Sequence, residues 1–301
     1  MLRRYRPLVF ASLAFPALAT MFATLGAASL LNMLHLPRRA HEPLPEARPA
    51  EIQTTDGARL EASWIGPDTM PPASASCVLF LHGVGGARDR VDRFVPALRS
   101  AGYAILAPDS RAHGESGGDT ITFGLLEKHD AVAWARWMRE HGCSRIFGLG
   151  ESMGASVLID AAAMEPLFTA IVADSAFADL LDEARHRAGR LFPFPQLVAG
   201  PLARLTVAGG SLYTRLALDL DFSQASPIRS IARARTPVLL IHGSLDNRTP
   251  PSHSERLAAA SPGTTELWLV PGAGHVRSFR AAPEEYNRRM LAWFAGHSAQ
   301  N

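Results

Sequence analysis

The chain has 301 residues, which is enough to bury the core of one large α/β domain or of two smaller ones. Its content of 47% hydrophobic and 19% charged residues excludes an intrinsically disordered chain. A net charge of +2, with the basic residues scattered along the sequence, argues against a nucleic-acid partner, which would need a basic groove or stripe.

The first segment of the chain is apolar. The run from Leu8 to Leu36 carries no formal charge, and as a helix it would reach roughly 43 Å. The hydrocarbon core of a bilayer is only about 30 Å thick, so the run can cross it with tilt, and Pro16 need only kink the helix. We expect residues 1–36 to form an uncleaved signal anchor, a single transmembrane helix. The alternative is a signal peptide with its cleavage site at Ala17-Leu18-Ala19.

Arginines flank this run on both sides, so its orientation depends on which set dominates. Those before the run are Arg3, Arg4 and Arg6, and those after it are Arg38, Arg39 and Arg48. We expect the first set to hold the N-terminus in the cytoplasm, with the folded domain exported and anchored in the inner membrane of a bacterium. Residues 37–50 contain four prolines, which predicts a semi-rigid linker between membrane and domain.

From residue 51 to residue 301 short apolar runs alternate with helical patterns. This alternation predicts one α/β domain in which helices cover both faces of a mostly parallel sheet. Asp56-Gly57 suits the turn of an opening hairpin. The predicted strands are 51–55, 59–65, 78–81, 103–107, 145–149, 170–173, 238–241 and 267–270. The predicted helices are 92–101, 125–141, 153–164, 252–260 and 283–295.

The interval 176–235 interrupts the alternation, because it shows no strand and its helical pieces are broken by prolines and glycines. The breaking residues are Pro193, Pro195, Pro201 and Gly209-Gly210. We expect this insertion to form a lid over a ligand site. Its apolar residues suit either ligand contacts or plain packing, and they include Phe177, Leu191, Phe192, Phe194, Leu197 and Leu202.

The sequence Gly150-Glu151-Ser152-Met153-Gly154 matches the pattern of a nucleophile elbow. An apolar run precedes it and a helical pattern follows it, which is the strand, sharp turn and helix that this motif requires. A serine hydroxyl becomes a useful nucleophile only when a base takes its proton and the turn exposes its oxygen. Ser152 is therefore the candidate nucleophile.

A second motif, His82-Gly83-Val84-Gly85-Gly86, follows the predicted strand 78–81. A tetrahedral intermediate needs two preorganised N–H donors, and the candidates for this oxyanion hole are the backbone N–H groups of Val84 and Met153. The alternative is a glycine-rich turn that serves connection only. A Walker phosphate loop is excluded, because no Gly-Lys-Ser/Thr follows.

The elbow implies the order nucleophile, acid, histidine along the chain. Asp246 lies beyond the predicted strand 238–241, and His275 lies in a glycine-rich loop beyond the strand 267–270. His275 would take the proton of Ser152, and Asp246 would fix its tautomer and stabilise the imidazolium. Asp174, at the end of strand 170–173, is the alternative acid.

Taken together, the elbow, the His-Gly loop, Asp246 and His275 resemble the α/β-hydrolase superfamily over residues 51–298. The loop 109–116, Asp-Ser-Arg-Ala-His-Gly-Glu-Ser, is similar to one in its serine-aminopeptidase and lipase-like (esterase) branch. The resemblance implies an α/β-hydrolase fold, with an eight-stranded sheet and a helical lid inserted after strand 6. It also makes the strands that follow Cys77 and Cys143 neighbours, so these residues can form a disulfide in an exported domain; otherwise they are two buried thiols.

Other polar residues near the motifs are expected to have structural roles. We expect His82 and His113 to shape loops and His242 to be a satisfied core or loop histidine. The exposed face of a predicted helix carries Glu127, His129 and Asp130. No cluster of His, Cys, Asp or Glu has the spacing of metal ligands, so we expect neither a metal nor another cofactor.

The predicted function is hydrolysis of a carboxylic ester or related acyl bond of a small-molecule or lipid-like substrate, through an acyl-enzyme at Ser152. One alternative is a serine peptidase or amidase, in which lid acids would bind a positively charged peptide terminus. These acids are Asp179, Asp182 and Glu183. An alternative of another class is a non-catalytic, membrane-tethered protein that uses the scaffold for binding.

Overall fold

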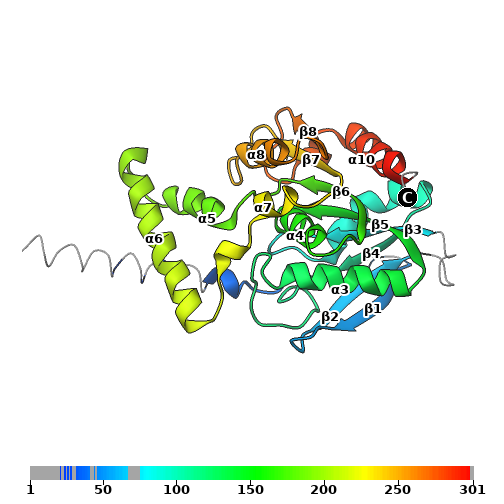
Figure 1. Cartoon of the computed structure of the whole chain (residues 1–301), viewed down its shortest axis with the longest axis horizontal. Helices are drawn as coiled ribbons and strands as arrows, with labels where there is room; N and C mark the ends of the chain where they lie inside the picture. The colour runs from blue at the N-terminus through cyan, green and yellow to red at the C-terminus, as the bar shows by residue number, and fades with distance from the viewer. Residues whose placement is uncertain are drawn as a thin grey trace, which may run out of the picture.

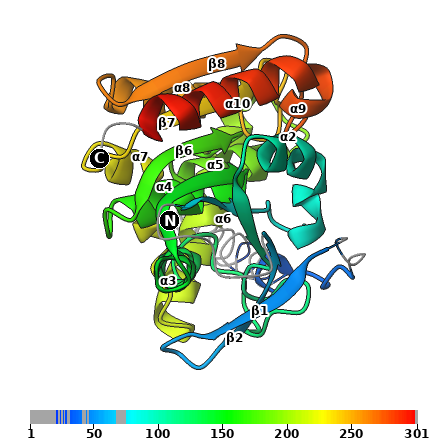
Figure 2. The same ribbon diagram turned by 90° about the vertical axis from the view of Figure 1, so that its right-hand side faces the viewer.

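The computed structural model of the protein describes residues 32–40, 44, 46–66 and 75–298, together with Met21, Thr24, Gly26 and Ala28. Its eight strands form one sheet in the order β1-β2-β4-β3-β5-β6-β7-β8 (Figures 1 and 2). The strands β1, β2 and β4 pair antiparallel, and every other neighbouring pair is parallel. The predicted eight-stranded, mostly parallel sheet is therefore confirmed. The strands are β1 Arg48–Gln53, β2 Arg59–Ile65, β3 Ala75–Leu81, β4 Ala104–Pro108, β5 Cys143–Glu151, β6 Phe168–Asp174, β7 Val238–Gly243 and β8 Thr265–Val270.

Helices cover both faces of the sheet (Figure 2). The first strands connect to η1 Arg88–Phe94, α2 Val95–Ser100, α3 Glu127–Glu140 and α4 Met153–Ala162. The insertion between β6 and β7 contains α5 Leu180–Gly189, α6 Gln196–Ala217, η2 Phe222–Gln224 and α7 Pro227–Ile231. The last part contains α8 Ser252–Ala260, α9 Ser278–Ala281 and α10 Pro283–Ser298. Figure 1 shows α5 and α6 projecting away from the sheet.

Alternation along the buried strands divides the interior into two cores. In β3, Val78 and Phe80 point into the core shared with α2 and α10, whereas Leu79 and Leu81 point into the core shared with α3 and α4. Successive side chains of a strand point to opposite faces, so a strand that is apolar at every position is buried on both. This explains why the central strands read as continuous apolar runs in the sequence.

The helix α6 corrects one prediction, because it runs without interruption through Pro201 and Gly209-Gly210. The ring of a proline normally clashes with the Cβ of the residue before it, and here that residue is Gly200, which has none. The helix also buries small side chains, which allow other segments to approach closely. Its buried residues are Ala199, Ala203, Thr206, Gly210 and Thr214.

Two acids of α3 were predicted on its exposed face and are buried instead, whereas His129 is exposed as predicted. The Glu127 carboxylate accepts hydrogen bonds from the N–H and hydroxyl groups of Thr122, both at 2.6 Å. Asp130 pairs with the buried Arg111 at 2.6 Å. Both acids therefore fix the long loop between β4 and α3, a role that helical periodicity does not reveal.

The predicted anchor, Leu8–Leu36, lies largely outside the described residues. Within the part of the chain that is described, no helix combines the length and the apolar character needed to span a bilayer. The predicted linker 37–50 lies against the domain where it is described: Arg38 donates to the carbonyl of Gly118 at 2.7 Å, and Leu44 is buried. The last three linker residues belong to β1, an edge strand that tolerates Pro49.

Cys77 and Cys143 are joined by a disulfide, with Cα atoms 5.8 Å apart. The bond links β3 to β5, which pair directly in the sheet. It therefore cross-links the two strands that lead into the glycine-rich loop and the elbow.

Replacing Cys77 and Cys143 together with alanine should lower the free energy of unfolding by about 2–4 kcal/mol, because the bond closes a 66-residue loop. Urea denaturation under non-reducing conditions measures the difference, and reductant should destabilise the wild type in the same direction. Two titratable thiols in the denatured, unreduced wild type would contradict the disulfide.

Candidate active site

Ser152 lies on the turn between β5 and α4. Its φ of 51° and ψ of −114° place its backbone in a region that non-glycine residues rarely adopt. Two glycines leave room for this turn: a Cβ on Gly150 would lie 2.6 Å from the Ala155 nitrogen, and one on Gly154 would overlap the Leu81 carbonyl. The Ser152 N–H also donates to the Asp174 carbonyl at 2.8 Å. The sequence thus forces the serine side chain out of the regular path of the strand.

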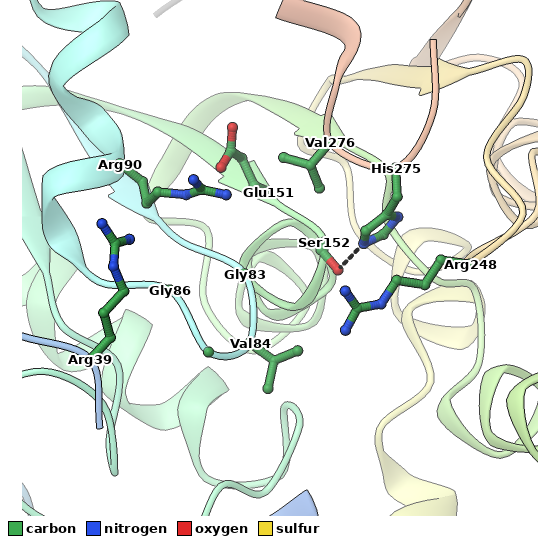
Figure 3. Close-up of a pocket in the computed structure, with 11 residues that line it drawn as sticks. Arg39, Gly83, Val84, Gly86, Arg90, Glu151, Ser152, Arg248, His275 and Val276 are labelled. Atoms are coloured by element: carbon green, nitrogen blue, oxygen red, sulfur yellow. Dashed lines mark hydrogen bonds between the residues drawn. The ribbon is translucent and has the colours of Figure 1, made fainter. Parts of the chain in front are cut away.

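Three residues from distant parts of the chain meet at this turn. The Nε2 atom of His275 lies 2.9 Å from Ser152 Oγ (Figure 3). Its Nδ1 atom lies 2.7 Å from Asp246 Oδ2. His275 follows β8 and Asp246 follows β7. Because these strands run parallel to β5, both residues lie at the carboxyl ends of the strands, where β5 also ends. In this arrangement Nδ1 donates to the carboxylate, which leaves Nε2 free to accept the Ser152 hydroxyl proton.

The Asp246 carboxylate is held by several donors. Its Oδ1 accepts the N–H groups of Arg248 and Thr249, both at 2.9 Å. Burial would raise the pKa of Asp246, but hydrogen bonds from His242 and His275 outweigh burial and hold this pKa well below its usual range. Asp246 therefore remains ionised and fixes the orientation of His275. The buried His242 has the structural role expected of it, since it also contacts the Ser254 hydroxyl and the Thr249 carbonyl.

Asp174, the alternative acid, is occupied elsewhere. Its Oδ1 accepts the hydroxyl groups of Ser175 at 2.9 Å and of Ser278 at 3.1 Å. Burial raises its pKa. The geometry therefore favours Asp246 as the partner of His275.

The glycine-rich loop after β3 lies directly beside Ser152. A Cβ on Gly83 would lie 3.2 Å from that of Ser152. Val84, the next residue of this loop, carries the first predicted donor. The second donor is the N–H of Met153, which has no acceptor within the helix because Met153 is the first residue of α4. Both predicted oxyanion donors therefore belong to segments that adjoin Ser152.

Two buried histidines hold this loop in place, as predicted from the sequence. His82 donates to the Gly83 carbonyl at 2.8 Å and accepts the Ser110 N–H at 3.0 Å. The pKa of His82 is lowered to about 4, mainly by burial and secondly by the neighbouring His113. Burial likewise lowers the pKa of His113, which accepts the Gly85 N–H at 3.0 Å. Both rings are therefore neutral near pH 7 and act as fixed hydrogen-bonding groups.

A cavity of about 250 Å³ opens in front of Ser152. It is lined by Arg39, Gly83, Val84, Gly85, Gly86, Arg90, Glu151, Ser152, Arg248, His275 and Val276 (Figure 3). The arginines and Glu151 were not predicted as site residues. The sequence did hold a signal for two of them, because Glu151 belongs to the elbow motif and Arg248 lies two residues after Asp246. Residues of the predicted lid do not line the cavity. Within the described chain no group of three His, Cys, Asp or Glu side chains could hold a metal ion.

Comparisons with known proteins agree with this fold. A sequence profile of the alpha/beta hydrolase family matches residues 78–289. The uncharacterized protein Rv2307c of Mycobacterium tuberculosis is 31% identical over 233 residues, covering 77% of this chain and 73% of that protein. The uncharacterized protein YfhR of Escherichia coli is 26% identical over 271 residues, 88% of this chain and 86% of that protein.

The solved structure of the esterase Pf2001 of Pyrococcus furiosus is also similar. It superposes with a TM-score of 0.70 and 26% identity, covering 88% of this chain and 100% of the esterase chain. The chain therefore belongs to the alpha/beta hydrolase family, and it is a hydrolase with an esterase among its structural neighbours.

The substitution Asp246→Asn should slow the reaction of Ser152 with a fluorophosphonate probe by roughly 10³-fold, because His275 would lose the acceptor that fixes its tautomer. The matched variant Asp174→Asn keeps a hydrogen-bonding side chain at a buried acid and should change the rate by less than about threefold. Stopped labelling time courses on the two purified variants measure both rates. The reverse ranking would make Asp174 the acid.

Proposed function

We propose that the protein is a serine esterase that cleaves carboxylic esters through an acyl-enzyme intermediate. The observation that carries the proposal is the continuous hydrogen-bonded chain from Ser152 Oγ through the His275 ring to the Asp246 carboxylate. In a hydrolase scaffold this arrangement supplies a nucleophile, a base and an orienting acid in one site.

The first half-reaction forms the acyl-enzyme. Ser152 Oγ attacks the ester carbonyl carbon while its proton passes to His275 Nε2, and the charge that develops on the carbonyl oxygen is stabilised by the N–H groups of Val84 and Met153. His275 then gives this proton to the departing alkoxide, and the bond between carbon and the leaving oxygen breaks. In the second half-reaction His275 takes a proton from water, whose oxygen attacks the acyl carbon. His275 then gives this proton to Ser152 Oγ as the bond between carbon and Oγ breaks, which releases the carboxylic acid and free Ser152.

Ester cleavage is better supported than the peptidase alternative. The lid acids that could bind a peptide amine are engaged elsewhere: Asp179 accepts N–H groups at the start of α5, Asp182 pairs with Arg185, and Glu183 pairs with Arg187. These acids do not line the cavity, whose charged side chains are mainly arginines. A positively charged peptide terminus would therefore meet like charge.

Purified wild-type protein should react with a fluorophosphonate and hydrolyse a panel of p-nitrophenyl acyl esters, whereas Ser152→Ala should lose labelling and at least roughly 10³-fold in kcat/KM. A parallel panel of aminoacyl p-nitroanilides measures peptidase activity, and we expect it to be the slower reaction. Equal labelling of wild type and Ser152→Ala would overturn Ser152 as the nucleophile. A wild type that neither reacts with the probe nor hydrolyses any ester would point to the non-catalytic, ligand-binding alternative.

We also propose that the N-terminal segment anchors the protein in a membrane as a single transmembrane helix, with the domain on the exported side. The spanning part of this helix ends before Met33 and not at the predicted residue 36, because Leu34 is fully buried in the core of the domain and its carbonyl accepts the Ile121 N–H. The uncharged run Leu8–Leu36 and the arginines before it support this orientation. The disulfide between Cys77 and Cys143 supports it as well, because such bonds persist mainly in oxidising compartments.

The outer face of α6 supports a position at the membrane surface. Nine of the thirteen large apolar side chains that are exposed in the described part of the chain lie within residues 191–218. Val198, Leu205, Leu212 and Leu216 follow one another at spacings that keep them on one side of α6, and we name these four residues the α6 apolar surface. The helix contains two arginines and no acid, which suits anionic lipid headgroups.

The opposite face of α6 contacts the N-terminal segment. A Cβ on Gly26 would overlap the Thr206 carbonyl, so the two backbones touch without an intervening side chain. Because Gly26 belongs to the proposed anchor, the α6 apolar surface lies beside the chain that enters the bilayer. We therefore assign the occupant of this surface as lipid.

A fluorescent NBD label tests this assignment on the full chain in lipid nanodiscs. The label on Leu216→Cys should show blue-shifted emission and quenching by spin-labelled lipid, because it would enter the acyl boundary about 5–10 Å deep. The matched control is Leu245→Cys, which is 67% exposed, compared with 76% for Leu216, and lies outside α6. Equal emission and quenching at the two positions would overturn the assignment.

A further inference from the structure

The cavity in front of Ser152 is rich in positive charge. Three of its eleven lining residues are arginines, and Val84 and Val276 are its aliphatic side chains. Figure 3 shows Arg39 and Arg90 on one side of Ser152, and Arg248 on the other side beside His275. A hydrolase that bound only an acyl chain would gain nothing from this lining.

As far as the structure describes the chain, the acidic side chains around the cavity form an ion pair with only one of these three arginines. Arg39 pairs with Asp89 at 2.9 Å. The Glu151 carboxylate, which also lines the cavity, forms an ion pair with Arg93 in the layer behind it. Two cavity arginines remain after these pairs are assigned.

These two arginines are Arg90 and Arg248. Within the described part of the chain, their guanidinium groups have no hydrogen-bond or ion-pair partner. Each guanidinium presents five N–H donors in a planar fork that matches the geometry of carboxylate and phosphate oxygens. Unpaired guanidinium groups on both sides of a reactive serine form a site for an anion.

We propose that Arg90 and Arg248 bind an anionic group, a carboxylate or a phosphate, on the ester that Ser152 cleaves. The inference rests on the proposed esterase function and specifies its substrate class. His275 protonates the departing oxygen, so the leaving group lies on the side of His275 and Arg248. The acyl group then extends to the opposite side, towards Arg90. Arg248 therefore binds an anion on the alcohol half of the ester, and Arg90 binds an anion on the acyl half.

Pairs of esters that have nearly the same shape but differ in charge test the effect of the anionic group on kcat/KM. On the acyl side the pair is 4-nitrophenyl hemiglutarate and its neutral methyl ester. On the alcohol side the pair is 4-acetoxybenzoate and its methyl ester, and 4-acetoxyphenyl phosphate tests phosphate in place of carboxylate. In the wild type we expect kcat/KM for each anionic ester to exceed that of its neutral partner by about tenfold, and to fall towards it as salt is raised.

Single substitutions assign the two arginines. Arg90→Gln should lower the ratio of kcat/KM for the hemiglutarate to that for its methyl ester by about tenfold. Arg248→Gln should lower the corresponding ratio for the 4-acetoxy anions by the same factor. Arg99→Gln, at an exposed position of α2 outside the cavity, is the matched control and should change none of the ratios. Thermal unfolding of each variant checks that its fold is retained.

The outcomes separate this inference from the proposed function. If the wild type cleaves neutral esters at Ser152 at least as well as the anionic ones, or if both arginine variants keep the wild-type preference, the anion site is wrong and the esterase stands. If Ser152 reacts with neither a fluorophosphonate nor any of the esters, the esterase is wrong, and the anion site is wrong with it.

Discussion

The register between β3, β5 and β6 determines where the reactive groups lie. Leu81 pairs with Gly150, and Glu151 pairs with Asp174, so the glycine-rich loop, the elbow and the turn after β6 begin at one level of the sheet. The Ser152 N–H continues this ladder by bonding to the Asp174 carbonyl. A shift of one residue in any of these strands would turn its side chains to the other face and separate the serine from its neighbours.

Much of this arrangement could be predicted from the sequence, because its determinants are local or follow from topology. The apolar strands, the glycines around Ser152 and the chain order of Asp246 and His275 are readable without coordinates. The continuity of α6 was not, because the proline that should break it follows a glycine and its small residues pack against other segments. The burial of Glu127 was also missed, since its partners lie in a loop whose path the sequence does not specify.

The charges around the site were the least predictable part, because each depends on neighbours from several loops. Arg248 follows Asp246 by two residues and still faces the cavity, whereas Arg93 belongs to η1 and turns behind it to pair with Glu151. The buried histidines near the site have their charge removed by their surroundings. Burial keeps His82 uncharged, and a neutral ring that both donates and accepts a hydrogen bond can join two loops where a charged one could not.

The bond between Cys77 and Cys143 also affects the order in which the molecule can come apart. It joins β3 and β5, whose far ends carry the glycine-rich loop and Ser152, in the middle of the sheet. The outer strands β1 and β8 have a neighbour on one side only and can separate while the central pair stays covalently joined. Separation of β1 therefore leaves the three residues that meet at Ser152 in place, whereas separation of β8 would carry away His275, which follows that strand.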